Sequence, residues 1–478
     1  MAQSVIEQAP LNTQASGIRL TPVEQEIIFV IENDDAVANE VKVKFGVEVH
    51  IGTASLNLNV DDDLVGIFKA APNNEGRGIF DLKNIVENYV KADSTAYRSS
   101  RYKTAHIGTN TKDFPIHIVD KLSSNQNSIR YFACQFFVEF LNATTNVVER
   151  APFTNRNSEQ YLLINGYVTH SDVLDVDFPD FGFNMDNFIP SGSAADKKFL
   201  TNAPTTQYAN DGDYGTLAFM TPSQATALNT KWITITYYNS SGVAYAGIDS
   251  YMRSVVATGS YSFWSNDSTD QMIFLGCFPG NLKNWSSNYA TAYSTDLSYY
   301  TIQVNNAGTG AFDQPLQTVT INVNCPETKN YEPIRLCWLN QWGAWDYYTF
   351  TKKSTRSIST QGTTYTQLGG TWNEKRYRPH SYKGGKKSFR VNAVDRITMN
   401  TDFVNEDYNI MFEELTNSPE VYVLEGYQSD SANSYLNQYV APVRLTSSSF
   451  SRKTKANDNL IQYSFEIEKS KTLRTQSI

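Results

Sequence analysis

The chain has 478 residues, enough for roughly two to four domains with sizeable cores. Its formal net charge of −9 argues against a general nucleic-acid-binding protein, which would carry a basic surface. No basic segment followed by an apolar one opens the chain, and no run of 18 apolar residues occurs in it. We therefore expect neither a secretory signal nor insertion into a membrane.

The composition favours strands over helices. Only 19% of the residues are charged, whereas 13% are aromatic, and Asn, Ser and Thr are abundant. Aromatic and β-branched residues suit pleated surfaces, and Asn, Ser, Asp and Gly suit turns. We predict a mainly β fold of two or more antiparallel β-sandwich domains with a few short helices. The predicted parts are a polar N-terminal arm (1–20), an N-terminal β-sandwich with one helix (21–155), a central β-rich domain (156–350), and a C-terminal basic loop region with a small α+β domain (351–478).

The N-terminal part shows the clearest periodicity. Apolar residues occupy every second position from Val41 to Ile51, which predicts a half-buried strand. His50 lies on the polar side of this strand, so we expect it to face solvent. Residues 129–141 are apolar on both faces, as in the central strand of a sandwich. Asp81 precedes a helical pattern that reaches Val90, which predicts a short helix.

The central part contains several strand-like segments and one segment rich in tryptophan. YLLINGYV, WITITYY, MIFLGCF, YYTIQV and TVTINV are predicted strands. Residues 334–350 read IRLCWLNQWGAWDYYTF, and we predict a buried hairpin with a turn around 340–344. Trp338, Trp342 and Trp345 would supply apolar area, and Gly343 permits a turn with φ > 0.

The C-terminal part is expected to hold a second short helix. Tyr408, Met411, Phe412 and Leu415 share one face of a helix predicted over 406–415, with Asn405 as its cap. Strands PEVYVLEGY, APVRLTSSS and LIQYSFEIE should follow.

No pattern typical of a catalytic site is present. The chain lacks the GxSxG, P-loop, HExxH and GxGxxG motifs, and its histidines show no metal-ligand spacing. We therefore expect no enzyme activity, no catalytic residue, no metal site and no cofactor. Four widely spaced cysteines are interpreted as buried thiols. Two acidic clusters are interpreted as solvated loops, although Ca²⁺ binding by one of them stays open. They comprise Asp61, Asp62 and Asp63, and Asp172, Asp175, Asp177 and Asp180.

A basic segment interrupts this acidic chain. Between Lys352 and Arg396 there are eleven basic residues and two acidic ones, a local charge of +9, so the rest of the chain carries −18. Pro379, Gly384 and Gly385 predict a loop rather than a core strand. We interpret it as a surface that docks on an acidic neighbouring copy, the alternatives being contact with nucleic acid or a solvated face. The residues predicted for this assembly surface are Lys375, Arg376, Arg378, Lys383, Lys386, Lys387 and Arg390.

Five segments in the same order resemble a family of structural virion proteins from crAss-like and marine tailed bacteriophages, many of which infect Bacteroidetes. They are GRGIFDLKNIVENYV, KKFLTNAPTTQ, PIRLCWLNQWGAWDYYTFT, EELTNSPEVYV and NDNLIQYSFEIE. The resemblance implies a virion component made in the host cytoplasm, in the tail hub, collar or baseplate. Its expected partners are copies of itself in a ring and other tail proteins, and no catalytic residue is implied.

One alternative function remains from the sequence. A carbohydrate-binding or receptor-binding tail protein would also be β-rich, with exposed aromatic residues along a groove. Trp264, Trp285 and nearby tyrosines could form such a groove, and host-surface glycans would then be the ligand. A depolymerase would usually show β-helix repeats, which the sequence lacks.

Overall fold

The structure is a computed structural model whose described residues are mainly β, which confirms the predicted fold class. The chain divides into two compact units, each described by itself below. Unit 1 comprises Met1–Asn324, Leu339–Asp346 and Ser429–Ser434, and unit 2 comprises Cys325–Trp338, Tyr347–Gln428 and Tyr435–Ile478. The structure describes residues 3–9, 20–54, 56–58, 63–96, 115–158, 160–169, 185–189, 197–221, 231–253, 271–306, 317–323, 331–370, 376–424, 440–447, 449–453, 461–470 and 475–477.

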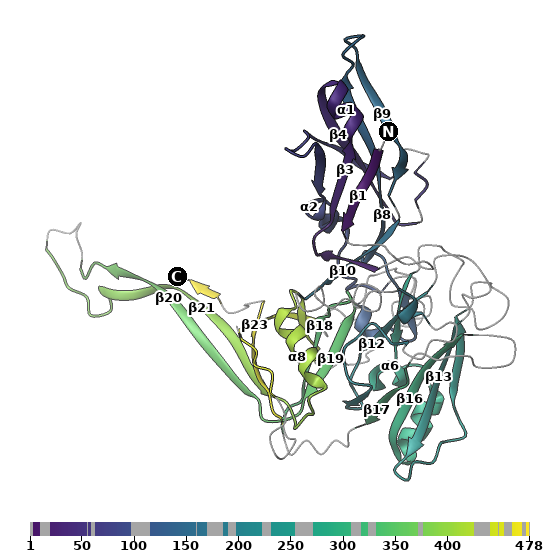
Figure 1. Cartoon of the computed structure of the whole chain (residues 1–478). Helices are drawn as coiled ribbons and strands as arrows, with labels where there is room; N and C mark the ends of the chain where they lie inside the picture. Colours follow the sequence, from purple (N-terminus) through teal and green to yellow (C-terminus); the bar gives the residue numbers. More distant parts are fainter. Residues whose placement is uncertain are drawn as a thin grey trace, which may run out of the picture. The chain divides into compact units, whose positions relative to one another are not determined.

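Two facing sheets form the N-terminal sandwich of unit 1 (Figure 1). One sheet has the order β1 (Gln3–Ala9), β3 (Ile28–Asn33), β6 (Arg77–Asp81). The other has the order β2 (Leu20–Glu24), β10 (Tyr161–Tyr167), β8 (Ile129–Leu141), β4 (Val41–Gly52), β5 (Leu64–Ala70), and β9 (Val148–Asn157) also pairs with β8.

Two of these strands change the predicted limits of the sandwich. Strand β1 pairs antiparallel with β3, so the predicted polar arm over residues 1–20 is wrong for residues 3–9. Strand β10 lies beyond the predicted boundary at residue 155, yet it pairs antiparallel with β8 and parallel with β2. The reason is the length of β8, whose 13 residues pair with β10 at one end and β9 at the other.

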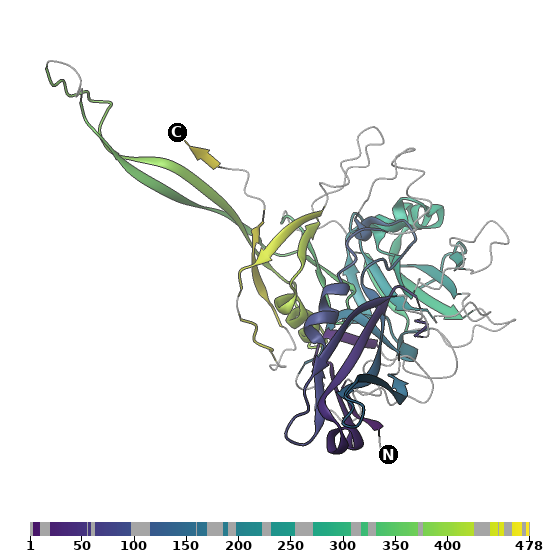
Figure 2. The same ribbon diagram turned by 90° about the horizontal axis from the view of Figure 1, so that it is seen from above.

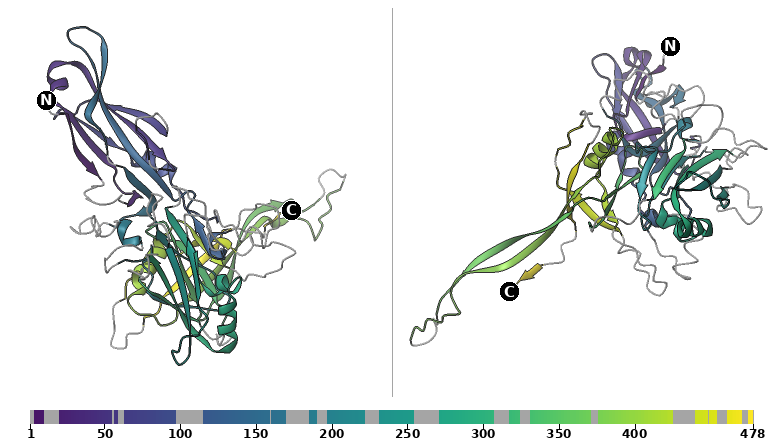
Figure 3. Two further views of the ribbon diagram at one scale, coloured as in Figure 1. Left: turned by 90° about the vertical axis from the view of Figure 1, so that its right-hand side faces the viewer. Right: turned by 90° about the horizontal axis from the view of Figure 1, so that it is seen from below.

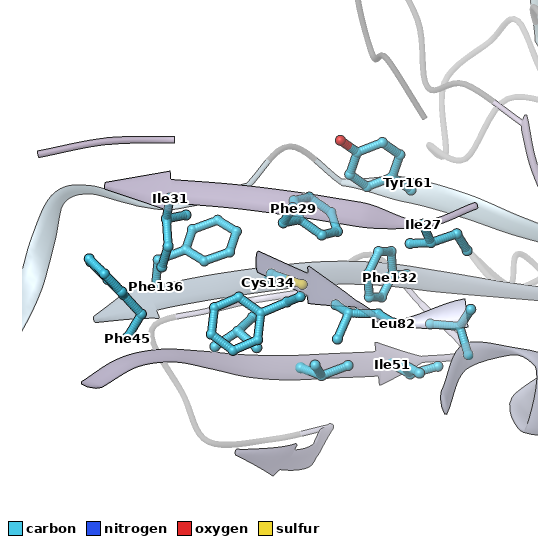
Figure 4. Packing of buried hydrophobic residues seen from close by; sticks show 14 of the residues in the cluster. Ile27, Phe29, Ile31, Phe45, Ile51, Leu82, Phe132, Cys134, Phe136 and Tyr161 are labelled. Carbon is cyan, nitrogen blue, oxygen red and sulfur yellow. The ribbon is translucent and has the colours of Figure 1, made fainter. Parts of the chain in front are cut away.

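Side chains from both sheets interlock to form the core of the sandwich. Figure 4 shows Phe29 of β3 lying against Phe132 and Phe136 of β8, with ring centroids 6.1 and 5.7 Å apart. The predicted apolar face of β4 is confirmed from Phe45 to Ile51, because Phe45, Val47, Val49 and Ile51 are all buried. Strand β8 is buried on both faces over most of its length, as its sequence predicts for a central strand.

The prediction that His50 faces solvent is wrong, because this side chain is buried. Residues 56–58 fold back against the sheet and are fixed there by glutamine side chains of neighbouring segments. Gln135 donates from Nε2 to the carbonyl of Leu58 (2.7 Å), and Gln160 exchanges two hydrogen bonds with the backbone of Leu56. Residues 56–58 therefore cover the face of β4 that carries His50. The alternation of polar residues alone predicts that this face is exposed to solvent.

Both predicted helices exist, but their limits differ from those predicted. Helix α2 spans Lys83–Val86 and continues as the 3₁₀-helix η1 (Glu87–Tyr89), and the Asp81 side chain accepts from the backbone N–H of Lys83. Helix α8 spans Tyr408–Asn417 and begins after Asp407 rather than Asn405. In the part of the chain that the structure describes, three further helices were not predicted, because each is short and its sequence gives little apolar periodicity. They are α1 (Asp34–Asn39), α6 (Pro279–Lys283) and α7 (Ser287–Thr295).

The remaining strands of unit 1 form two more sheets. One has the order β11 (Thr206–Ala209), β17 (Val319–Val323), β16 (Leu297–Asn306), β13 (Lys231–Asn239), β14 (Asp249–Arg253). The other has the order β12 (Thr216–Met220), β15 (Met272–Gly276), β7 (Leu122–Ser124). Four strand predictions made from the central sequence correspond to β13, β15, β16 and β17. Two short 3₁₀-helices, η2 (Ile116–Ile118) and η3 (Met185–Phe188), lie in the same unit.

A buried turn over residues 340–344 belongs to unit 1. The Asn340 side chain accepts from the backbone N–H groups of Trp342 and Ala344, both at 3.0 Å, and donates to the carbonyl of Leu200 at 2.9 Å. Gly343 has φ +74°, and a β-carbon there would lie 2.5 Å from the carbonyl oxygen of Asn165. The close approach of two backbones therefore requires glycine at this position.

Unit 2 is built on one antiparallel sheet that is covered by α8. The ring of Phe412 on α8 lies 5.0 Å from Tyr348 and 5.5 Å from Phe465, measured between centroids. Met411 and Leu415 are also buried, so the predicted apolar face of the helix is confirmed. The strand order is β19 (Trp345–Phe350), β18 (Ile334–Leu339), β22 (Val421–Leu424), β23 (Val440–Leu445), β24 (Ser464–Lys469), β21 (Gly385–Asn400), β20 (Thr355–Gln367), and β25 (Thr475–Ser477) also pairs with β21.

Replacing Trp338 by Ala should destabilise the protein. The side chain is fully buried in β18, so its removal leaves a cavity, and we expect the free energy of unfolding to fall by about 3–5 kcal/mol. Denaturant unfolding followed by tyrosine and tryptophan fluorescence measures this change. The matched control is Tyr382→Ala, whose side chain is exposed and which should leave stability nearly unchanged. Equal stability of the two variants would contradict the packing described.

Alanine substitutions at two glycines with positive φ distinguish the cost of backbone strain from the cost of a steric clash. Gly385 has φ +77°, and a β-carbon added there would meet open space, so Gly385→Ala should cost only about 1 kcal/mol. Gly343→Ala adds a clash with the carbonyl of Asn165 and should cost clearly more. Thermal unfolding of both variants tests this order, and a smaller loss for Gly343→Ala would show that the turn can move away.

Candidate assembly surface

Strands β20 and β21 form a long hairpin that continues beyond the rest of their sheet (Figure 1). Strand β24 pairs only with residues 396–400 of β21, and β25 pairs with residues 390–392. The other views show the same two strands side by side as they leave the remaining strands of unit 2 (Figures 2 and 3). We call residues 357–394 the arm. At about 3.4 Å per residue, the part of β21 not paired with β24 spans roughly 35 Å.

The local sequence explains why the arm is a hairpin. Strand β20 reads TRSISTQGTTYTQ and pairs residue by residue with β21, with a bulge after Thr363. Threonine and tyrosine suit strands even without burial, and cross-strand Thr pairs stabilise them. Gly384 and Gly385 adopt positive φ where the chain enters β21. The prediction of a basic loop is therefore wrong for residues 355–367 and 385–398, which belong to strands β20 and β21.

The predicted cationic residues gather on the outer part of the arm. On β21, Lys386 and Arg390 are exposed and Lys387 is half-buried. Lys383 is half-buried in the turn before β21, its ammonium 5.7 Å from the Tyr382 ring centroid, and the Lys387 ammonium donates to the carbonyl of Tyr382 at 2.9 Å. Of the other predicted residues, Arg376 and Arg378 are exposed nearby, and Lys375 lies outside the described residues.

Ion pairs occur at the base of the hairpin. Arg356 of β20 pairs with Glu332 at 2.6 Å, and Arg396 of β21 pairs with Glu468 at 3.4 Å. Within the part of the chain that the structure describes, Lys383, Lys386 and Lys387 form no ion pair. The outer arm is therefore strongly cationic.

Large aromatic side chains lie exposed between these cations. Tyr382 is 69% exposed and Phe389 is 52% exposed, and Tyr377 is also exposed. The Phe389 ring meets Tyr365 of the opposite strand edge-on, with centroids 6.4 Å apart. Exposed aromatic residues surrounded by charge are typical of protein-binding surfaces. The sequence interleaves Tyr377, Tyr382 and Phe389 with the cations, and the structure adds Tyr365 of the opposite strand to this group.

The tryptophans of the predicted hairpin lie inside the protein and not on a binding surface. Trp338, Trp342 and Trp345 are buried, and Trp345 donates from its indole N–H to the carbonyl of Asp93 at 2.8 Å. Trp342 packs against Phe188 with ring centroids 4.8 Å apart. All three act as packing residues in this structure.

A buried polar network surrounds Asp249 in unit 1. Its carboxylate accepts hydrogen bonds from Ser286, from Tyr237 (2.5 Å) and from Asn288 (2.9 Å), and Ser286 Oγ also caps α7 by accepting from the Tyr289 N–H. The network therefore fixes the start of α7 against β13 and β14.

The aromatic residues proposed for glycan binding are only partly described. Trp264 lies outside the described residues. Trp285 is half-buried, and Lys121 Nζ lies 4.1 Å from its ring centroid. Tyr289 is buried, and Tyr293 stacks on it at 5.9 Å. Trp285 has one face covered by a lysine, so it does not offer both faces to a sugar.

The remaining candidate sites are the cysteines and the two acidic clusters. Cys134, Cys277 and Cys337 are buried free thiols, and burial raises the pKa of Cys134, while Cys325 lies outside the described residues. Among the residues described, no group of three His, Cys, Asp or Glu side chains could hold a metal ion. Of the first acidic cluster only Asp63 is described, and its carbonyl accepts from the Ile51 N–H. The second acidic cluster lies outside the described residues.

Comparisons with other proteins add no assignment. In the described ranges, no helix is both long and apolar enough to cross a membrane. Comparison of the chain with models of protein families gives no match, and comparison with curated proteins gives none either.

Proposed function

We propose that this chain is a non-enzymatic structural component of a tailed-phage virion, placed in the tail hub, collar or baseplate. It assembles with copies of itself into a ring and docks other tail proteins, and the arm is its assembly surface. Two observations support the proposal independently. The resemblance of five sequence segments supports the virion, and the geometry of the arm supports assembly.

The arm carries the proposal because it buries so little of its own surface. In the described part of β20, the residues from Thr355 to Thr364 are all exposed. An isolated two-stranded hairpin is marginally stable in water, so a segment of this kind needs a partner to bury its exposed aromatic rings. Exposed Tyr382 and Phe389 would supply the apolar contact, and the lysines beside them would select a partner of negative charge.

The rest of the protein suits a scaffold. The N-terminal sandwich of unit 1 has a continuous apolar core, as a rigid structural domain requires. The buried polar network around Asp249 connects β13, β14 and the start of α7 within the same unit. In unit 2, the base of the arm belongs to a larger antiparallel sheet, which supports the arm.

Charge reversal in the arm tests the proposal. The variant Lys383→Glu/Lys386→Glu/Lys387→Glu should weaken self-association while leaving thermal unfolding nearly unchanged, because none of these side chains is buried. Wild-type assembly should also weaken with added salt, since the Debye length falls from about 10 Å at 0.1 M to about 3 Å at 1 M. Light scattering across a salt series measures both effects.

A matched control uses cations outside the arm. Lys42→Glu/Lys44→Glu/Lys91→Glu changes the net charge equally at exposed positions of unit 1 and should assemble like the wild type. If the control and the arm variant assembled equally well at every salt concentration, the arm would not be the assembly surface. Absence of the chain from purified phage particles would refute the virion assignment separately.

A further inference from the structure

Two neighbouring segments of the chain carry opposite charge. The arm, residues 357–394, contains seven basic residues and one acidic residue, a charge of +6. Residues 397–443 contain eight acidic residues and no Lys, Arg or His, a charge of −8. Blocks of opposite charge on one chain attract each other between copies and fix the register in which the copies meet.

The cations at the base of the hairpin and those of the outer arm differ in their ion pairs. Figure 1 shows the hairpin extending away from α8, which lies in the acidic segment. Arg396 at the hairpin base pairs with Glu466 and Glu468 of β24, whereas Lys383, Lys386 and Lys387 have no ion pair within the described residues. Lys383, Lys386 and Lys387 can therefore pair with another molecule.

The segment that leads into α8 and the first turn of this helix combine carboxylates with exposed apolar side chains. Phe403 is 55% exposed and Ile410 is 48% exposed, which is high for residues of this size. Asp407, also exposed, and Glu406 precede Ile410 by three and four positions, and the backbone N–H of Asn409 already bonds the carbonyl of Glu406 at 2.9 Å. Helical spacing therefore places Glu406, Asp407 and Ile410 on one side. We call Phe403, Glu406, Asp407 and Ile410 the acceptor face.

Ile410, the member of the acceptor face that lies within α8, is on the exposed side of this helix. The buried residues of α8 include Tyr408, Met411, Phe412 and Leu415, which point into the unit 2 core. Asp407 is held by a 2.6 Å hydrogen bond from the Asn405 side chain and forms no ion pair in the described part of the chain. The face therefore presents negative charge beside apolar area, the complement of the arm's lysines beside Tyr382 and Phe389.

We propose that the arm of one copy docks on the acceptor face of the next copy. This inference rests on the proposed function and names the surface that receives the arm. The aromatic rings of the arm would pack on Phe403 and Ile410, and its lysines would pair with Glu406 and Asp407. Because arm and acceptor differ, the contact is head-to-tail, and repeated copies close into a ring when the rotation between them permits it.

Nucleic acid is a less suitable occupant of the arm. A phosphate backbone would meet the arm's cations, but it would also approach a chain of net charge −9 with an acidic segment adjoining the arm. Phosphates would leave the exposed apolar residues of the acceptor face uncovered. A second copy satisfies both surfaces in one contact.

The test mixes two charge-reversed variants. The arm variant is Lys383→Glu/Lys386→Glu/Lys387→Glu, and the acceptor variant is Glu406→Lys/Asp407→Lys. Alone, each brings like charges together, so analytical ultracentrifugation should show self-association weakened about tenfold or more. In an equimolar mixture every arm meets an acceptor of opposite charge, and assembly should return. The control pair Glu26→Lys/Glu87→Lys should assemble alone and should not rescue the arm variant.

The outcomes separate this inference from the proposed function. If the acceptor variant assembled like the wild type and the mixture stayed dissociated, the arm would dock elsewhere, and only the acceptor face would be refuted. A wild-type protein that stays monomeric at low salt but binds double-stranded DNA through the arm would overturn both proposals. Because Asp407 adjoins α8, Phe403→Ser/Ile410→Ser provides a second acceptor variant. It should fail to assemble without being rescued, and thermal unfolding should show that it folds.

Discussion

The Asn340 side chain satisfies three backbone groups of a turn that is buried among segments distant in the sequence. Its amide binds the N–H groups of Trp342 and Ala344 and the carbonyl of Leu200. Beside it, the carbonyl of Gln341 accepts from the N–H of Tyr167 at 3.2 Å. Buried backbone groups must find partners, so this turn fixes where the 165–167 and 200 segments can lie in unit 1.

Asp93 is a second buried polar residue of unit 1 whose side chain is satisfied by hydrogen bonds. Its buried carboxylate accepts from the backbone N–H groups of Gln126, Asn127 and Ser128 and from the Ser128 hydroxyl. Burial nevertheless raises the pKa of Asp93, because desolvation outweighs these hydrogen bonds. The Asp93 carbonyl in turn accepts from the Trp345 indole. Polar contacts, rather than apolar area alone, therefore set the alignment of the loops in unit 1.

The arm differs from these buried segments of unit 1 in that it buries little of its surface. Its side chains are mostly exposed, its three lysines at 383, 386 and 387 form no ion pair among the described residues, and its aromatic rings remain in water. A protein stabilised by satisfied buried groups can present such a segment only because the base of the hairpin is part of a larger sheet. Because the aromatic rings of the arm are exposed, a partner that covered them would gain the free energy of burying this apolar surface. A head-to-tail contact between arm and acceptor face would use it for assembly.

The sequence by itself determined the fold class, the strands with one or two buried faces and the apolar face of α8. The apolar residues at every second position from Phe45 to Ile51 predicted a strand with one apolar face in the core. The continuous apolar run of β8 predicted a strand that is buried on both faces. Only the tertiary structure decided the rest. A strand exposed on both faces, such as β20, has no hydrophobic period, so the arm was predicted as a loop. His50 is buried because a return of the chain at residues 56–58 covers its face, and no local pattern records which segment will do so.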